Sequence, residues 1–360
     1  MVLFQLLMKI GIFLGVLSVL IVVHEFGHFI VAKRVGVRVD KFSIGFGPRL
    51  FTRKKGETEY SLSAIPLGGY VKLAGDSLEE YSGDRDEYYT QPPGKRFAII
   101  FCGPLLNYIL GFLCFWMIFF MGYPTYSTRV GGLMDGFGAK SAGVQVQDVI
   151  VKVNGTAVSA WEEIRDIVQG PATPAVIPLL VRRGEREIEI PVRIKEESKD
   201  DLIGGKTKVG LLGITPDLDD TVYQRYGVGK ALSLGFRETV DLTSLTYRGL
   251  WRMLTGRLSM KESVTGPLGI YKITAEAADQ GMIALMFLVA VLNISLAIFN
   301  LLPLPILDGG HVLFLGIEKI RGRPLSVKTE RVIMQVGLYF IVMLALLVTY
   351  NDILRIVTGR

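Results

Sequence analysis

The sequence predicts a polytopic α-helical membrane protein with about four transmembrane helices, a membrane-associated β-hairpin and one soluble insert. Three observations predict this class. Half of the 360 residues are hydrophobic, and a mean hydropathy of +0.39 is high for a soluble protein of this size. Four long segments contain few or no charged residues. Lys and Arg gather in the short segments between them.

Each of the four spans reaches the roughly 20 residues that cross about 30 Å of hydrocarbon. The first covers residues 1–34, and its apolar stretch 3–32 is interrupted only by one lysine and a polar cluster near its end. The second, 97–121, and the fourth, 332–351, contain no charged residue, and the third, 280–310, contains none until its last three residues. Because the first span is long and lacks a small-residue cleavage site, it is not expected to be a removable signal peptide.

The positions of Lys and Arg predict the orientation of these spans. Twelve lie in residues 33–96 and five in the loop 311–331. Both segments are therefore expected to face the cytoplasm by the positive-inside rule. An even number of spans then places both termini and the long segment 122–279 on the extracytoplasmic side.

The cytoplasmic segment 35–96 carries the pattern of a β-hairpin. Residues 60–75, YSLSAIPLGGYVKLAG, are typical of a strand, a Pro-Leu-Gly-Gly turn and a second strand. Just before it, the glycines of SIGFGPRL (43–50) let a backbone pass close to another group. We expect this hairpin to associate with the membrane.

The extracytoplasmic segment is predicted to hold one small domain and a linker. Its residues 135–158 alternate apolar and polar positions and end in an Asn-Gly turn, and a helical stretch and a second hairpin pattern follow. The stretch AGVQVQDVIVKVNG resembles a PDZ domain, so 126–215 is expected to be a PDZ-like α+β domain rather than another small β-rich domain. Residues 216–279 place apolar residues at helical spacing among basic ones, which predicts an amphipathic helical linker at the membrane surface.

The polar cluster in the first span is HEFGH, residues 24–28. Ionisable groups are costly at membrane depth and tend to be functional there. On a helix, His24 and His28 share one face, so both imidazoles can bind one metal ion, and the adjacent Glu25 can take a proton from metal-bound water. Zinc suits this pair and lowers the pKa of its water to about 7. The cluster therefore predicts a zinc site with Glu25 as general base.

A catalytic zinc ion usually has a third protein ligand. The end of the third span, FNLLPLPILDGGH, offers Asp308 and His311. Pro303 and Pro305 interrupt the helix there, and non-helical backbone at membrane depth is tolerated where it lines a cavity. These residues alone do not decide between the two candidates, since Asp308 also suits a helix end. For His311, an interfacial, hydrogen-bonded role is favoured.

HEFGH, the GFGP loop, the PDZ-like insert and NLLPLPILDGG together resemble the site-2 protease family of intramembrane zinc metalloproteases (M50 type). Within it, the chain is most similar to the bacterial RseP-type regulators of intramembrane proteolysis, over essentially its whole length. The resemblance implies that His24, His28 and Asp308 are the zinc ligands. It also implies that Glu25 is the general base and that Asn300 places substrate or stabilises charge. One PDZ pattern is present where the RseP arrangement has two.

We expect the substrate to be a transmembrane segment that unwinds and adds as a strand to the edge of the hairpin. The candidate substrate-binding residues of the hairpin are Gly45, Phe46, Gly47, Gly68, Gly69 and Tyr70.

The resemblance implies an endopeptidase of the bacterial inner membrane, with its active site near the cytoplasmic side, that cuts transmembrane proteins. The expected reaction is the second cut of an anti-sigma-type regulator in envelope stress signalling, after another protease has cut first. Clearance of signal-peptide remnants is an alternative, and an inert PDZ scaffold or a metal transporter are alternatives of another class. Membrane lipid is an expected partner. Nucleic acid is not, because the net charge of +6 comes without a recognisable nucleic-acid-binding motif.

Overall fold

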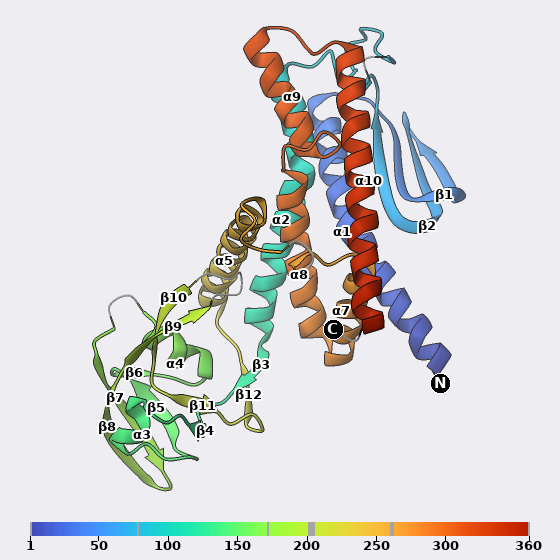
Figure 1. Ribbon diagram of the computed structural model, residues 1–360. Coiled ribbons are helices and arrows are strands. Elements are labelled where there is room, and N and C mark those ends of the chain that lie inside the picture. The colour runs from blue at the N-terminus through green and yellow to red at the C-terminus, as the bar shows by residue number, and fades with distance from the viewer. Residues whose placement is uncertain (1, 78, 171–172, 201–205, 260–262, 359–360) are drawn as a thin grey trace. The chain divides into compact units, whose positions relative to one another are not determined.

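The computed structural model describes residues 2–77, 79–170, 173–200, 206–259 and 263–358. The chain divides into two compact units, whose elements Figure 1 labels. Unit 1 comprises Met1–Trp116, Gly235–Met253 and Ser259–Arg360, and unit 2 comprises Met117–Leu234 and Leu254–Leu258.

Among the described residues, four helices are long and apolar enough to cross a membrane. They are α1 (Val2–Val35), α2 (Pro93–Met121), α8 (Met282–Asn300) and α10 (Val327–Thr358). They correspond to the four predicted spans, so the chain is a polytopic membrane protein that also contains β-sheet. α10 extends beyond the predicted 332–351 at both ends, because the charged residues that flank the apolar stretch, such as Lys328 and Arg355, are good helix formers.

One residue of this extension, Asp352, joins α10 to α7 (Pro267–Gln280). Its side chain is buried, and its carboxylate accepts hydrogen bonds from the backbone N–H groups of Gly266, at 3.1 Å, and Gly269, at 2.9 Å. The first N–H groups of a helix lack helical partners, and the helix dipole favours negative charge there. Because α7 packs on α1 and α8, Asp352 holds α10 to the other helices of unit 1.

The predicted hairpin is present in unit 1 as β1 (Val39–Lys55) and β2 (Thr58–Leu73), which pair antiparallel beside α1 (Figure 1). Its turn lies at residues 56–57. The predicted Pro-Leu-Gly-Gly turn is wrong, because residues 66–69 lie inside β2. Both strands are long and bent. Pro and Gly residues are typical of a bend within a strand as well as of a tight turn, so the sequence pattern alone does not distinguish the two.

The bending makes the first half of β1 a central strand. Ser43 pairs with Ser61 on one side and with Tyr70 on the other. β1 bends next to this point at Gly45 and Gly47, whose φ angles of +85° and +83° are rare for residues with a Cβ atom. The segment of β2 that contains Tyr70 therefore forms an edge of the sheet.

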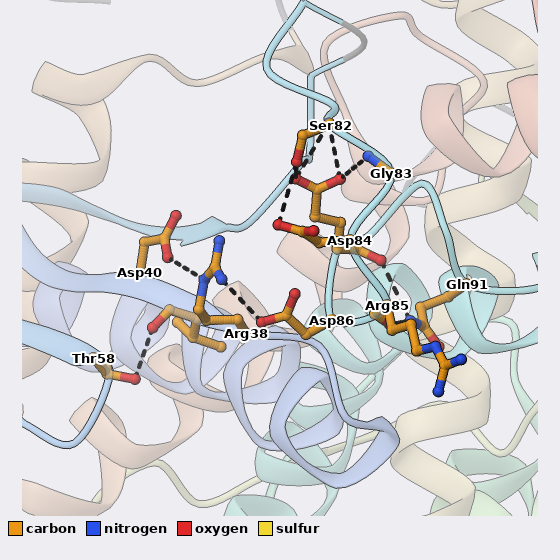
Figure 2. A network of polar contacts seen from close by, with 11 residues as sticks. Arg38, Asp40, Thr58, Ser82, Gly83, Asp84, Arg85, Asp86 and Gln91 are labelled. Atoms are coloured by element: carbon orange, nitrogen blue, oxygen red, sulfur yellow. Dashed lines mark hydrogen bonds and ion pairs between the residues drawn. The ribbon is translucent and has the colours of Figure 1, made fainter.

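Polar contacts hold the segment between β2 and α2 (Figure 2). Arg38 lies between Asp40, at 3.1 Å, and Asp86, at 3.0 Å. Farther along, the Glu87 carboxylate accepts hydrogen bonds from the Ser82 hydroxyl, at 2.6 Å, and from the Gly83 N–H, at 2.9 Å. These donors, the Ser82 hydroxyl first, hold the pKa of Glu87 below its ordinary value.

We expect Glu87→Gln to destabilise the protein at neutral pH. A carboxyl group whose pKa is lowered in the folded state stabilises the fold above its ordinary pKa of 4.5, and this stabilisation is lost as the pH falls through the lower, folded-state value. The melting-temperature difference between parent and variant, measured in detergent, should therefore shrink as the pH is lowered from neutral to about pH 3. A difference that stays constant across this range would contradict the proposed role of the ionised carboxylate.

Unit 2 is built around an antiparallel sheet of order β6-β5-β7-β8. Its strands are β5 (Val149–Val153), β6 (Thr156–Ala157), β7 (Val176–Arg183) and β8 (Arg186–Arg193). Alternate residues such as Ile177, Leu179 and Val181 are fully buried in its core. Its described residues also form the short helices α3 (Gly138–Ala142) and α4 (Trp161–Val168). Two-stranded pairs accompany them: β3 (Tyr123–Tyr126) with β12 (Thr221–Gln224), β4 (Val130–Leu133) with β11 (Ile214–Pro216), and β9 (Lys195–Asp200) with β10 (Lys206–Leu211).

The predicted linker 216–279 is not helical from its start. Its residues 221–224, which include the β-prone Thr, Val and Tyr, form β12 and pair with β3. The helical part begins with α5 (Val228–Leu254) and continues with α7. The predicted ranges 126–215 and 216–279 also include residues 171–172, 201–205 and 260–262, which lie outside the described residues.

Candidate metal centre

His24 and His28 lie one turn apart on α1, as the HEFGH spacing predicts. Their Nε2 atoms are 3.1 Å apart. Only 11% of the His24 side chain and 14% of the His28 side chain are exposed. Two imidazole nitrogens therefore converge on one point inside unit 1.

Asp308 reaches this point from the first turn of α9 (Asp308–Arg321). Its Oδ2 lies 3.1 Å from Nε2 of His24 and 3.6 Å from Nε2 of His28. The two glycines that follow allow the approach. A Cβ at Gly309 or Gly310 would lie 2.2 Å from a backbone oxygen of the chain between α8 and α9. The LDGG sequence thus lets the start of α9 pack directly on the preceding backbone.

These three side chains fit a zinc ion. Their ligand atoms all lie within 4.8 Å of one another. Tetrahedral zinc with bonds of about 2.0–2.1 Å places its ligands about 3.3 Å apart, and the observed separations run from 3.1 to 3.6 Å. His311 lines the same cavity, but within the described part of the chain it does not belong to this group. The structure therefore brings Asp308, rather than His311, to the histidine pair.

Helix α2 orients His28. The Nδ1 atom of His28 lies 2.9 Å from the carbonyl oxygen of Ile99. A carbonyl only accepts, so Nδ1 carries the proton and Nε2 keeps the lone pair that a metal needs. The ring also packs on Gly103, where a Cβ would lie 2.3 Å from Nε2. Close to it, a Cβ at Gly27 of α1 would lie equally close to the backbone of Cys102, so glycines bring α1 and α2 into contact beside the two histidines.

Glu25 lies beside the β2 edge. The backbone N–H of Val71 lies near its carboxylate. A Cβ at Gly69 would lie 3.5 Å from Cγ of Glu25 and 2.9 Å from the carbonyl oxygen of Ser43. Gly69 thus lies in van der Waals contact with Glu25, and its lack of a Cβ avoids a clash with the Ser43 carbonyl in the neighbouring strand.

A cavity of about 390 Å³ surrounds the cluster. Glu25, Tyr70 and Asn300 line it together with the three converging side chains. Its lining also includes an ion pair between Arg96 of α2 and Glu318 of α9. The Arg96 guanidinium lies over the rings of Tyr88 and Tyr89, and burial raises the pKa of both tyrosines.

The predicted substrate-binding residues fall into two groups. Tyr70 and Asn300 line the cavity, and Gly69 lies against Glu25. The other four lie at the bends of the sheet, where the Phe46 ring stacks on Tyr70 at 6.3 Å and packs on Gly68. These four are Gly45, Phe46, Gly47 and Gly68.

Four further contributors to the site are not assigned a role by the sequence: Ile99, Gly103, Val71 and Arg96. Two of them act through backbone atoms and one through the lack of a side chain, so residue type alone does not reveal them. The Gly103–Pro104 pair inside an apolar span was the one available signal.

Known proteins resemble this chain over most of its length. Residues 12–344 match the model of the family described as Peptidase family M50. The chain is 36% identical over 359 residues to a candidate zinc metalloprotease of Agrobacterium fabrum, Atu1380, with 95% of this chain and 94% of that protein covered. It is 28% identical to the zinc metalloprotease RasP of Oceanobacillus iheyensis and to the regulator of sigma-W protease RasP of Bacillus subtilis, with 96% of this chain and 98% of each of those proteins covered. The predicted resemblance is confirmed: the chain belongs to peptidase family M50 and is a zinc metalloprotease.

Proposed function

We propose that this protein is an intramembrane endopeptidase that hydrolyses peptide bonds within the transmembrane segments of other proteins. One observation carries the proposal. The group formed by His24, His28 and Asp308 lies on and beside helices long and apolar enough to cross a membrane, and it opens into a cavity that also contains Glu25. A hydrolytic site within the membrane can act only on a peptide bond that also lies within the membrane.

His24, His28 and Asp308 are the proposed zinc ligands. When bound, zinc supplies Lewis acidity that makes a nearby water easier to deprotonate. Glu25 accepts the proton of that water and later delivers it to the leaving amine. The Val71 N–H, which lies near the Glu25 carboxylate, favours its ionised form at the cavity.

The β2 edge is the proposed substrate-binding element. A transmembrane helix shields its peptide bonds through its own hydrogen bonds, so hydrolysis requires local unwinding. Residues 69–73 form an edge of the sheet, with β1 on one side and Glu25 on the other. An unwound substrate segment that pairs with this edge by strand addition would pass beside the metal ligands. Tyr70 then contacts its side chains, and the amide of Asn300, which lines the cavity, donates to the charge that develops on the scissile carbonyl.

The sidedness of the protein is part of the proposal. The positions of Lys and Arg support a cytoplasmic β1–β2 sheet, extracytoplasmic termini and an extracytoplasmic unit 2. We assign unit 2 a PDZ-like role in screening substrates. Its antiparallel sheet and the helix α4 support this assignment. Helix α5 exposes apolar side chains at helical spacing, which supports contact with membrane lipid. The exposed residues are Leu232, Phe236, Val240, Tyr247 and Trp251.

The proposed physiological reaction is the second cut of a membrane-bound anti-sigma-type regulator, after another protease has removed its outer part. The name of the Bacillus subtilis relative, a regulator of sigma-W protease, supports this choice. Clearance of signal-peptide remnants would use the same site and differs only in the substrate.

A comparison of membrane peptides tests both the substrate and the screening role. Cells that carry Glu25→Gln are expected to accumulate membrane stubs that lack their outer domains, which parental cells do not accumulate. Accumulation of signal peptides alone would contradict the stress-signalling role.

In cells with residues 126–215 deleted, substrates with intact outer domains should now be cut. Loss of all cleavage in those cells would instead indicate that unit 2 is needed for docking.

A further inference from the structure

Asn107 of α2 is a polar side chain that the proposed reaction leaves without a role. It is fully buried, and neither its Nδ2 nor its Oδ1 has a hydrogen-bond partner within the described part of the chain. It lies in the middle of an apolar span. An unpaired buried amide destabilises a protein and is rare for that reason. The Asn107 amide is therefore expected to have a hydrogen-bond partner in the functional protein.

The position of Asn107 directs it toward the metal ligands. Gly103, one turn earlier on the same face of α2, packs against the His28 ring, with a Cβ at this position 2.3 Å from Nε2. Side chains on a helix lean toward its N-terminus and cover the preceding turn. The Asn107 amide therefore leans toward the turn that meets the histidines. α1 and α2 run in opposite directions (Figure 1) and meet where Gly103 contacts His28. His24, one turn before His28 on α1, therefore lies at the level of Asn107, one turn after Gly103 on α2.

His24 also has a side-chain nitrogen without a hydrogen-bond partner in the described residues. The two histidines approach each other through Nε2, and the Nδ1 of His28 is satisfied by the Ile99 carbonyl. The Nδ1 of His24 is buried and has no partner in the described residues. A histidine that binds a metal through one nitrogen almost always donates from the other, which fixes the ring and raises its basicity.

We propose that Asn107 is a positioning residue of the metal centre, whose Oδ1 accepts the Nδ1–H of His24 when the metal is bound. It would do for His24 what the Ile99 carbonyl does for His28. The inference rests on the proposed role of His24 as a zinc ligand. It assigns α2 both of the groups that orient the histidines of α1.

Asn293 of α8 provides a matched control. It is also fully buried within an apolar span, and its Oδ1 is also unpaired in the described residues. Its Nδ2, however, donates to the Val289 carbonyl of its own helix, at 2.8 Å. Its neighbour Ile294 packs on Gly111, two turns along α2 from Gly103. Asn293 thus lies farther from the histidines than Asn107 does.

The test is the zinc affinity of the zinc-free, full-length protein in lipid nanodiscs, measured by competition with a chelating dye. Loss of a partner that orients a metal-binding histidine typically weakens metal binding by about 10–100-fold, and this is the loss expected for Asn107→Leu. Asn107→Asp keeps an acceptor oxygen and should bind zinc about as tightly as the parent. Asn293→Leu should also bind as the parent does. The visible absorption of the Co²⁺-substituted protein should change in Asn107→Leu and stay unchanged in Asn293→Leu.

Parental zinc affinity in a folded Asn107→Leu would overturn the inference, and so would an equal loss in Asn293→Leu. Replacing an unpaired amide by an apolar group of similar shape should not lower the melting temperature of the zinc-free protein, so a loss of affinity without a loss of stability identifies the positioning role. If Asn107→Leu does not fold, Asn107→Asp decides: weakened binding in that variant overturns the inference. A parent protein that binds no zinc would instead overturn the proposed ligand set.

Discussion

Glu25→Gln is expected to abolish peptide hydrolysis while the protein keeps its zinc. Gln has the same shape as Glu but cannot accept the proton of the attacking water, and a positioned general base typically contributes about 10²–10⁴-fold to the rate. The variant retains His24, His28 and Asp308, so the metal content of the purified protein should equal that of the parent. Cleavage of a reporter transmembrane segment by parent and variant, together with metal analysis of both, measures this.

Glu189→Gln serves as the control for the same substitution, since Glu189 is exposed on β8 in unit 2. It should cleave at the parental rate. Cleavage by Glu25→Gln within a few-fold of the parent would show that another group takes the proton. Loss of zinc from the variant would show that Glu25 has a structural part in the metal site.

Gly103→Ala is expected to empty the metal site. The added methyl carbon would lie 2.3 Å from Nε2 of His28 and 2.5 Å from its Cε1, which is far inside contact distance. The neighbouring helices are held together by backbone contacts at Gly27, so the ring must turn away and cannot keep Nε2 on the metal. Zinc content and cleavage should both fall to background.

Gly94→Ala is its matched control. It lies on the same helix, and a Cβ there meets no atom within 4 Å. Alanine is the better helix former by about 1 kcal/mol, so propensity alone would make both substitutions harmless or favourable. Normal zinc content in Gly103→Ala would mean that α1 and α2 can move apart, and that their glycine contact does not position His28.

Much of the fold was predictable because its signals are local. Long apolar segments predicted α1, α2, α8 and α10 from composition alone. The bends of the hairpin were not predictable in the same way. Pro66 and the glycines after it suit a turn and a bent strand equally, and the choice depends on pairing with β1, which is remote in the chain.

The candidate site also combines residues that the sequence predicts with residues that depend on tertiary packing. The spacing of His24 and His28 is a helical repeat and needs no tertiary information. Asp308 lies 280 residues after His28, and only the resemblance to known proteases favoured it over His311. Its approach to the histidines depends on the packing of Gly309 and Gly310 against backbone, which is a tertiary contact. The contributions of Ile99 and Val71 come from backbone groups, which do not depend on residue type, so no sequence pattern predicts them.

The position of the cut tests the central claim most directly. The purified protein, loaded with zinc in lipid nanodiscs, is incubated with a transmembrane reporter, and the new termini are identified by mass spectrometry. An intramembrane protease leaves both new termini within the apolar span of the reporter, and a chelator abolishes the products until zinc is restored. Termini only in the aqueous flanks of the span, or products that persist in Glu25→Gln, would contradict it.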